Sequence, residues 1–213
     1  MFPRWTALHL ASRHGHPDTV SQLLTADSDV KARTKNEWTA LHLASRYGHT
    51  DTVSQLLTGG SDVKAKNKDE WTALHLASRY GHTDTVSQLL TAGSDVKAKD
   101  KDEWTALHLA SLQGHTDTVS QLLTAGSDVK AREENEWTAL HLASQEGHSD
   151  IVSQLPTAGS DVNAMEEDHR TALHLASLSG DLDTFRVLVE GGATLSIKNR
   201  EGWVIYFGLC FRQ

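Results

Sequence analysis

The seven residues Thr-Ala-Leu-His-Leu-Ala-Ser occur six times in this chain of 213 residues, and each copy begins 33 residues after the last. A fixed period of this length indicates one small supersecondary unit that is stacked on copies of itself. Such a stack offers an extended surface rather than a closed pocket, so we expect it to bind a partner. The copies begin at Thr6, Thr39, Thr72, Thr105, Thr138 and Thr171.

Composition excludes several other classes of protein. The net charge of −8 argues against non-specific binding to nucleic acid or to an anionic membrane. No apolar run approaches the ~20 residues that span a bilayer. Met1-Phe2-Pro3-Arg4 leads directly into the first repeat, which leaves no room for a signal peptide. The single cysteine, Cys210, rules out a disulfide framework. We therefore expect a cytoplasmic location, with a nuclear one as the alternative, and a monomer.

Each repeat contains signals for two short helices, which the third copy illustrates. Thr72 is placed to cap a first helix that includes residues 73–77, and Gly81 is placed to end it. Thr83 or Asp84 is placed to cap the second helix. Neither helix is long enough to be stable alone, so stacking must supply the stability.

The second helix of that repeat is amphipathic. Val86, Leu89 and Leu90 fall at i, i+3 and i+4, which is one stripe of a 3.6-residue period. Gly93 is placed as the left-handed C-cap. An extended, turning connection anchored by Val96 then leads to the next copy.

The whole pattern resembles the ankyrin repeat: Thr-Ala-Leu-His, then Gly-His, then Val-x-x-Leu-Leu, then Ala-Gly-Ser-Asp-Val. Near-identical copies of this kind resemble arrays of fungal and bacterial multi-repeat proteins. The resemblance implies an all-α solenoid of antiparallel helix pairs with hairpin-like tips, and a concave face of tips and first helices that binds other proteins. It implies one domain, 1–213, with a truncated first repeat at 1–33, repeats at 34–66, 67–99, 100–132, 133–165 and 166–198, and a degenerate cap or truncated seventh repeat at 199–213.

The tips depart from the family pattern, because Glu replaces the Gly that the family has at the turn. A non-glycine residue tolerates a left-handed turn less well, so we expect altered tip geometry. The substitutions are at Glu37, Glu70, Glu103 and Glu136.

The resemblance marks the tips, the residue before each Thr and the two residues before Gly-His as partner-facing. A Trp recurs before the Thr, and its two interpretations are packing over the root of the tip and direct contact with a partner. Tyr47 and Tyr80 favour contact because a Tyr stands before Gly-His in only two repeats. The candidate partner-binding residues are Trp38, Arg46, Tyr47, Lys68, Trp71, Arg79, Tyr80, Lys101, Trp104 and Trp137.

The charge of the tips changes along the chain. The early tips are rich in Lys and Arg, such as Lys64, Lys66 and Lys68, whereas the fifth carries Glu166, Glu167 and Asp168. This gradient would orient a partner of opposite polarity. The alternative is an ordinary solvated edge.

The thirteen histidines invite a metal or catalytic interpretation. Six belong to the Thr-x-x-His motif and five to Gly-His, and the resemblance implies that the first group bonds the Thr hydroxyl and the backbone. Zinc needs three or four convergent ligands, and every Ser, His or Asp that could form a catalytic set recurs with the repeat. We predict no catalytic residue, cofactor or metal. A His-dependent metal protein or enzyme is the alternative from another class, and the sensing arm of a larger cytosolic regulator is the alternative within binding proteins.

Two features look like flaws in the array. Pro156 replaces the second Leu of the Leu-Leu pair, and we expect its helix to stop or kink near Leu155 at a cost of ~3 kcal/mol. The junction between the fifth and sixth repeats should then be the weakest. The apolar run at 204–211 is expected either to lie on the sixth repeat as a cap or to be an exposed apolar end.

Overall fold

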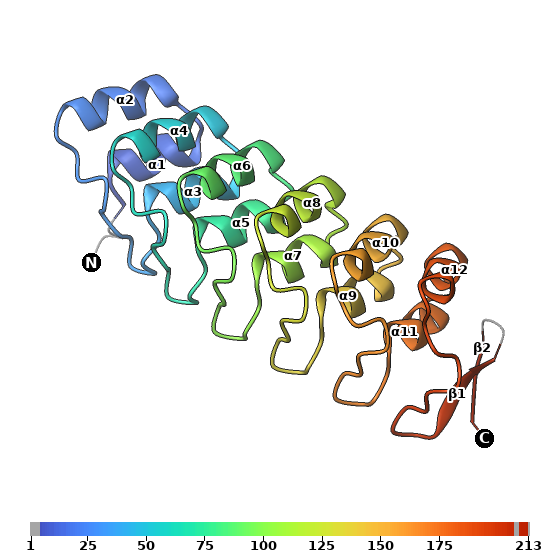
Figure 1. Ribbon diagram of the computed structural model, residues 1–213. Coiled ribbons are helices and arrows are strands. Elements are labelled where there is room, and N and C mark those ends of the chain that lie inside the picture. The colour runs from blue at the N-terminus through green and yellow to red at the C-terminus, as the bar shows by residue number, and fades with distance from the viewer. Residues whose placement is uncertain (1–4, 207–208, 213) are drawn as a thin grey trace. The chain divides into compact units, whose positions relative to one another are not determined.

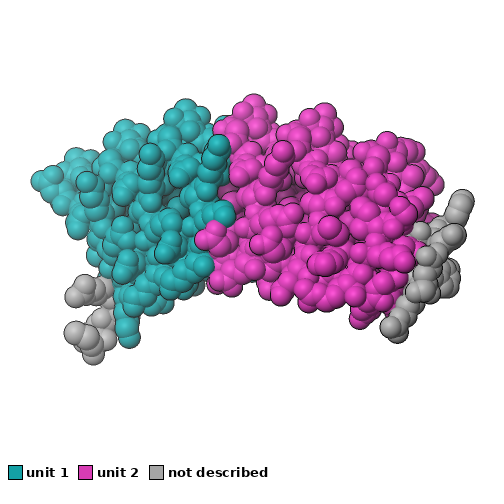
Figure 2. All heavy atoms as spheres, turned by 60° about the horizontal axis from the view of Figure 1, so that its bottom comes forward, with its two compact units in different colours: residues 1–101 teal, residues 102–213 magenta. Residues whose placement is uncertain are grey.

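A computed structural model describes residues 5–206 and 209–212, with side chains described for residues 5–204. The segment 1–4, for which we expect no signal peptide, lies outside the described residues, as do 207, 208 and 213. The described chain contains twelve helices and one two-stranded hairpin (Figure 1). It divides into two compact units, Met1–Lys101 and Asp102–Gln213 (Figure 2).

The first helix of each repeat begins directly after the motif Thr, as the sequence predicts. Thr72 adopts an extended backbone conformation, and its hydroxyl accepts the backbone N–H of His75. This bond gives a partner to one of the backbone N–H groups that a helix start leaves without an acceptor inside the helix. The six first helices are α1 (Ala7–Arg13), α3 (Ala40–Arg46), α5 (Ala73–Arg79), α7 (Ala106–Leu112), α9 (Ala139–Gln145) and α11 (Ala172–Ser179).

The second helices are slightly longer, and in five of the six the residue before the helix is a histidine. The expectation that Thr83 or Asp84 caps this helix is wrong. The cap position is His82, because its backbone leaves the helical region while Thr83 already lies inside. Gly93 follows the helix with φ +87°, as expected. The six helices are α2 (Pro17–Thr25), α4 (Thr50–Thr58), α6 (Thr83–Thr91), α8 (Thr116–Thr124), α10 (Ser149–Thr157) and α12 (Leu182–Glu190).

Within each unit the helices form two layers (Figure 1). In the first unit α3 packs between α1 and α5, and α4 packs between α2 and α6; in the second unit α9 lies between α7 and α11, and α10 between α8 and α12. Alanines such as Ala44 and leucines such as Leu56 have no exposed surface. The small side chains allow close approach and the leucines supply the buried apolar area. The expected all-α fold of stacked helix pairs is confirmed.

The tips keep a left-handed turn although its residue is Glu. The backbone of Glu70 has φ +62°, and the turn is closed by the Asn67 N–H to the Trp71 carbonyl at 3.0 Å. A left-handed non-glycine residue costs about 1–2 kcal/mol. The carboxylate forms an ion pair with Lys66 at 2.8 Å, which offsets part of that cost. The other three Glu residues at this position have φ between 62° and 65°.

Pro156 does not end its helix. The expectation that α10 stops near Leu155 is wrong, because the helix continues to Thr157 and has the same nine residues as α8. Only one N–H is lost, in the last turn, where the Ala158 N–H still reaches the Gln154 carbonyl at 3.1 Å. Leu155 is fully buried, whereas Leu123, the counterpart of Pro156, is half-buried. The weak junction between the fifth and sixth repeats stays a prediction.

The substitution Pro156→Leu is expected to raise the free energy of unfolding by about 2–3 kcal/mol, because it restores the N–H that bonds the Val152 carbonyl and removes the ring clash. Chemical denaturation measures the change. The reverse substitution in the neighbouring repeat, Leu123→Pro, is the matched control and should lower stability by a similar amount.

Amide exchange should be faster at 151–157 than at 117–124 in the wild-type chain, and equal protection would contradict the predicted weak junction.

The chain beyond the sixth repeat forms a hairpin rather than a helix pair. β1 (Trp203–Tyr206) pairs antiparallel with β2 (Leu209–Arg212). Both strands contact α11, and Val204 is 4% exposed. This part of the apolar run therefore lies on the sixth repeat, as one of the two interpretations of the sequence expects.

Candidate protein-binding surface

The motif histidine is held by hydrogen bonds on both ring nitrogens. In the second repeat the Thr39 N–H donates to His42 Nδ1 at 3.2 Å, and the Thr39 hydroxyl lies 2.7 Å from the same atom. Since Nδ1 accepts the backbone N–H, the ring proton is assigned to Nε2, which donates to the Trp71 carbonyl at 2.9 Å. The ring thus joins its own helix start to the next tip. The predicted bonds to the Thr hydroxyl and backbone are confirmed.

Burial keeps four of the six motif histidines neutral at pH 7. Burial lowers the pKa of His42 and of His141 to about 4, and it also lowers the pKa of His9 and His174. Within the part of the chain that the structure describes, there is no group of three or more His, Cys, Asp or Glu side chains that could hold a metal ion. The hydrogen bonds on both ring nitrogens show that the motif histidine, as at His42, holds the scaffold together.

Three of the histidines of Gly-His, namely His49, His82 and His148, bond a backbone carbonyl of the repeat before their own. His49 Nε2 donates to the Arg13 carbonyl at 3.0 Å, and His148 does the same to Leu112 at 3.1 Å. The His49 ring packs against Gly15 of the preceding repeat. A glycine is required there, because a Cβ on Gly15 would lie 2.5 Å from the His49 ring. Gly15 also has φ +67°, where other residues are strained.

A side-chain oxygen inside five of the tips accepts the backbone N–H four residues later. Glu133 accepts from Trp137 at 3.0 Å, and Glu166 accepts from Arg170 at 2.9 Å. Both residues are buried, with exposures of 5% and 4%, so their carboxylates are not part of the solvent-exposed edge. The sequence carried a signal for this role, because the residue four before the Trp or Arg always has a side-chain oxygen. These residues are Thr34, Asn67, Asp100, Glu133, Glu166 and Asn199.

Some of the basic tip residues are also used by the scaffold. Arg33 donates to the Lys66 carbonyl at 2.8 Å, and Lys66 donates to the Lys99 carbonyl at 2.9 Å. Arg132 does the same to Met165 at 2.8 Å. Each of these cations links its tip to the next one, so this row of charges is not available to a partner in the way that the sequence suggests.

The first unit brings three of the candidate residues together in one groove. Trp38, Arg46 and Tyr47 line a groove of about 480 Å³ together with Trp5 and Arg13. The Arg13 guanidinium lies 5.7 Å from the centre of the Trp5 ring and 5.8 Å from that of Tyr47. Arg13 was not among the candidates, although it occupies the position of Arg46 one period earlier.

A second groove, of about 270 Å³, lies one repeat further along the same unit. Trp38 and Arg46 line it together with Trp71, Arg79 and Tyr80. Arg46 lies 5.6 Å from the Trp38 ring and 5.5 Å from the Tyr80 ring, and Arg79 lies 5.4 Å from the Trp71 ring. The two tyrosines are 41% and 40% exposed. Arginine and aromatic rings therefore alternate along this face.

The remaining candidates lie outside these two grooves. Lys68 and Lys101 are exposed at the tips, where their backbone N–H groups bond the preceding tip at 3.1 and 3.3 Å. Trp104 and Trp137 belong to the second unit, whose first helices end in Leu, Gln and Ser rather than Arg.

Each Trp also packs on the motif histidine of its own repeat. The ring centres of Trp38 and His42 are 5.9 Å apart, and those of Trp137 and His141 are 6.0 Å apart. All five of these Trp residues, including Trp5, are half-buried. The packing interpretation of the recurring Trp is thus supported. In the first unit these Trp rings also lie against arginines, so direct contact with a partner stays a prediction there.

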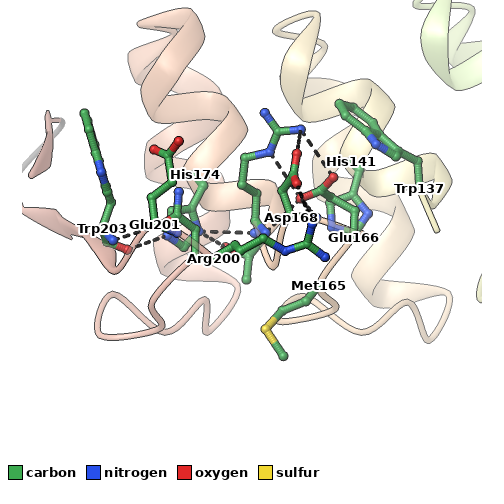
Figure 3. A network of polar contacts seen from close by, with 12 residues as sticks. Trp137, His141, Met165, Glu166, Asp168, His174, Arg200, Glu201 and Trp203 are labelled. Carbon is green, nitrogen blue, oxygen red and sulfur yellow. Dashed lines mark hydrogen bonds and ion pairs between the residues drawn. The ribbon is translucent and has the colours of Figure 1, made fainter. Parts of the chain in front are cut away.

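In the second unit, Arg170 takes the place of a Trp. It belongs to a polar network with Glu166, Asp168 and Arg200, and Figure 3 labels these three partners. The Arg170 guanidinium lies 5.8 Å from the Trp137 ring and bonds Glu166 at 3.1 Å and Asp168 at 3.4 Å. Arg200 reaches Asp168 from the next tip, also at 3.4 Å. Burial alone would raise the pKa of Glu166, but the bonds from Arg170 and two backbone N–H groups outweigh it and hold the pKa below its usual value.

The comparisons with known proteins agree with this architecture. A family model described as ankyrin repeats in three copies matches the chain at residues 3–67, 51–133 and 107–199. A search of curated proteins finds no match. Among the described residues, no helix is both long enough and apolar enough to cross a membrane. Ankyrin repeats are in general protein–protein interaction modules, and their fold is typically non-catalytic. The six 33-residue periods, the helix pairs and the family match together show that this chain belongs to the ankyrin repeat family.

Proposed function

We propose that the chain is a non-catalytic scaffold that binds a partner protein through the tip-and-first-helix face of its first unit. This face consists of the tips at 34–38 and 67–71 and the helices α1, α3 and α5. The proposal includes a monomeric state and a cytoplasmic location.

The observation that carries the proposal is the alternation of exposed aromatic and arginine side chains along two adjoining grooves. Trp, Tyr and Arg are the residues most enriched among those that dominate binding energy. Tyr47 and Tyr80 retain about two-fifths of their surface in contact with solvent, although both stack on an arginine. The candidate contacts are therefore Trp38, Arg46, Tyr47, Trp71, Arg79 and Tyr80, with Lys68 and Lys101 at the adjacent tips and Trp104 and Trp137 as candidates in the second unit.

The double substitution Tyr47→Ala/Tyr80→Ala should abolish partner capture while leaving the fold intact, because both side chains are exposed. Immobilised chain is incubated with cell extract, and the captured proteins are identified by mass spectrometry. Trp71→Ala/Tyr80→Ala should also abolish capture, although Trp71 is half-buried and packs on His75. Leu182→Ala is the matched control, since it removes a side chain of α12 that is 69% exposed and lies outside both grooves. Unchanged capture by both aromatic variants would defeat the proposal.

A further inference from the structure

We infer that the first unit binds an extended acidic segment in which every third residue is Asp or Glu, and that Arg13, Arg46 and Arg79 hold these carboxylates. The inference rests on the proposed function and specifies the chemistry of the partner.

Arg13 and Arg46 line the larger groove and lie against aromatic rings. Arg46 lies between the Trp38 and Tyr80 rings at 5.6 and 5.5 Å, and Arg13 lies between Trp5 and Tyr47. A guanidinium stacked by its faces keeps its in-plane N–H groups for a carboxylate, which it binds with two parallel hydrogen bonds. Stacking also fixes the side chain in advance, so less conformational entropy is lost when a ligand binds.

The charges of the larger groove call for an acidic ligand. Among the described residues, neither Arg13 nor Arg46 forms an ion pair with an acidic side chain. The side chains that line this groove include Lys35 as a third cation and no Asp or Glu. In the smaller groove the one acidic lining residue, Asp69, lies 3.9 Å from the Lys101 ammonium. By contrast, Arg170 in the second unit is bonded to Glu166 and Asp168.

The spacing of the arginines selects the conformation of the ligand. Arg13, Arg46 and Arg79 occupy the last position of α1, α3 and α5, which pack against one another in sequence. Packed helices lie about 8–10 Å apart. A polyproline II segment rises ~3.1 Å per residue with three residues per turn, so residues i, i+3 and i+6 share one face at ~9 Å intervals. In a β-strand the residues on one face are ~6.6 Å apart, which does not match.

The aromatic rings fit the same ligand. Segments in the polyproline II conformation dock into aromatic-lined grooves, because the conformation is already extended and its ring contacts need no hydrogen-bonded partner strand. The arginine row ends at α5, since the following first helices end in Leu112, Gln145 and Ser179. Three contacts correspond to a segment of about seven residues.

The test uses the full chain and two fluorescein-labelled peptides of equal composition in a proline frame. The first peptide carries Glu at positions i, i+3 and i+6, and the second carries Glu at i, i+2 and i+4. Fluorescence anisotropy is expected to show at least tenfold tighter binding of the first peptide. Arg46→Gln should weaken that binding about tenfold or more, because it removes a charge-assisted bidentate contact. Arg46→Lys should recover only part of the loss, since it keeps the charge but not the planar fork.

Lys64→Gln is the matched control, because Lys64 is an exposed tip residue of the same unit and does not line either groove. It should change the affinity less than twofold. Equal binding of both peptides, or equal losses in Arg46→Gln and Lys64→Gln, would reduce the effect to general charge and overturn the inference. A single-stranded oligothymidylate that binds more tightly than the peptide and depends on Arg46 would also overturn it. If no peptide binds while Tyr47→Ala/Tyr80→Ala still loses captured proteins, the acidic-segment inference fails and the proposed function stands.

Discussion

The free energy of unfolding is expected to fall by about 4 kcal/mol between pH 7 and pH 5, because His42 and His141 must be protonated in the unfolded chain but not in the folded one. Each folded pKa is about 4, against an ordinary value of 6.5. The unfolded state therefore binds more protons below pH 6.5, and stability is lost as the pH falls from 6.5 to 4. A pKa shift of this size lowers the free energy of unfolding by about 2 kcal/mol per histidine between pH 7 and pH 5. His9 and His174 act in the same direction.

The geometry explains why these rings resist protonation. Nδ1 of His42 accepts the Thr39 N–H, so a proton on Nδ1 would place two donors against each other. Carboxylates do not obscure the effect, because the lowered pKa of Glu70 and Glu166 makes their contributions disappear only below about pH 4.5.

Urea titrations at several pH values between 7 and 5 measure the proton uptake as the slope of stability against pH. His42→Gln/His141→Gln should flatten that slope, because an amide can donate and accept without titrating, even though the variant is less stable at pH 7. His14→Gln is the control, since His14 is exposed and lies outside the motif. A wild-type slope near zero would show that the motif histidines are not held neutral by the fold.

The substitution Glu166→Ala is expected to cost about 3 kcal/mol of unfolding free energy. Glu166 accepts the Asp168 and Arg170 N–H groups at 3.0 and 2.9 Å and the Arg170 guanidinium at 3.1 Å, and its side chain is 2% exposed. Removing the carboxylate leaves two backbone donors inside the tip without an acceptor, and it takes away the closer of the two carboxylates that bond Arg170. Thermal and urea denaturation measure the loss.

The other tips of this chain provide matched controls. Arg170→Trp recreates the pair of Glu133 and Trp137, and Glu166→Asn/Arg170→Trp recreates the pair of Asn67 and Trp71. In both of these natural tips the first side chain accepts the backbone N–H of the Trp. Both variants should lie within about 1 kcal/mol of the wild type, since each restores a satisfied tip. A loss below 1 kcal/mol in Glu166→Ala would show that the carboxylate does not anchor the tip.

Much of the fold follows from the repeat itself. The period predicts the helix pairs, Thr72 predicts the first helix start, and Gly93 predicts the end of the second helix. Helix starts and ends are determined by neighbours within a few residues, so local sequence is sufficient for them. The candidate site is predicted less completely. Trp38, Arg46 and Tyr47 do meet in one groove, but Arg13 completes it and was missed.

The errors at Pro156 and at the acidic tips share a physical cause, because each depends on how the nearby backbone folds around the side chain. Pro156 looks like a helix terminator, yet it falls in the last turn, where the Ala158 N–H still finds a carbonyl and the buried Leu155 holds the helix in place. Glu133 and Glu166 look like surface charge, yet backbone donors inside the tips take their oxygens. Side-chain direction depends on the folded tip and is not visible in composition.

The sequence by itself determines the repeat unit and its period, because these depend on residues that recur in every copy, and the resemblance to the ankyrin repeat implies the family and the scaffold role of the histidines. Only the tertiary structure decides which charges face solvent and which bond the next tip, as in Lys66 and Arg132. It alone also shows that Arg46 lies between the rings of Trp38 and Tyr80, which are 42 residues apart in the sequence. Contacts of this kind form when neighbouring repeats stack, and the surface that a partner would meet depends on them.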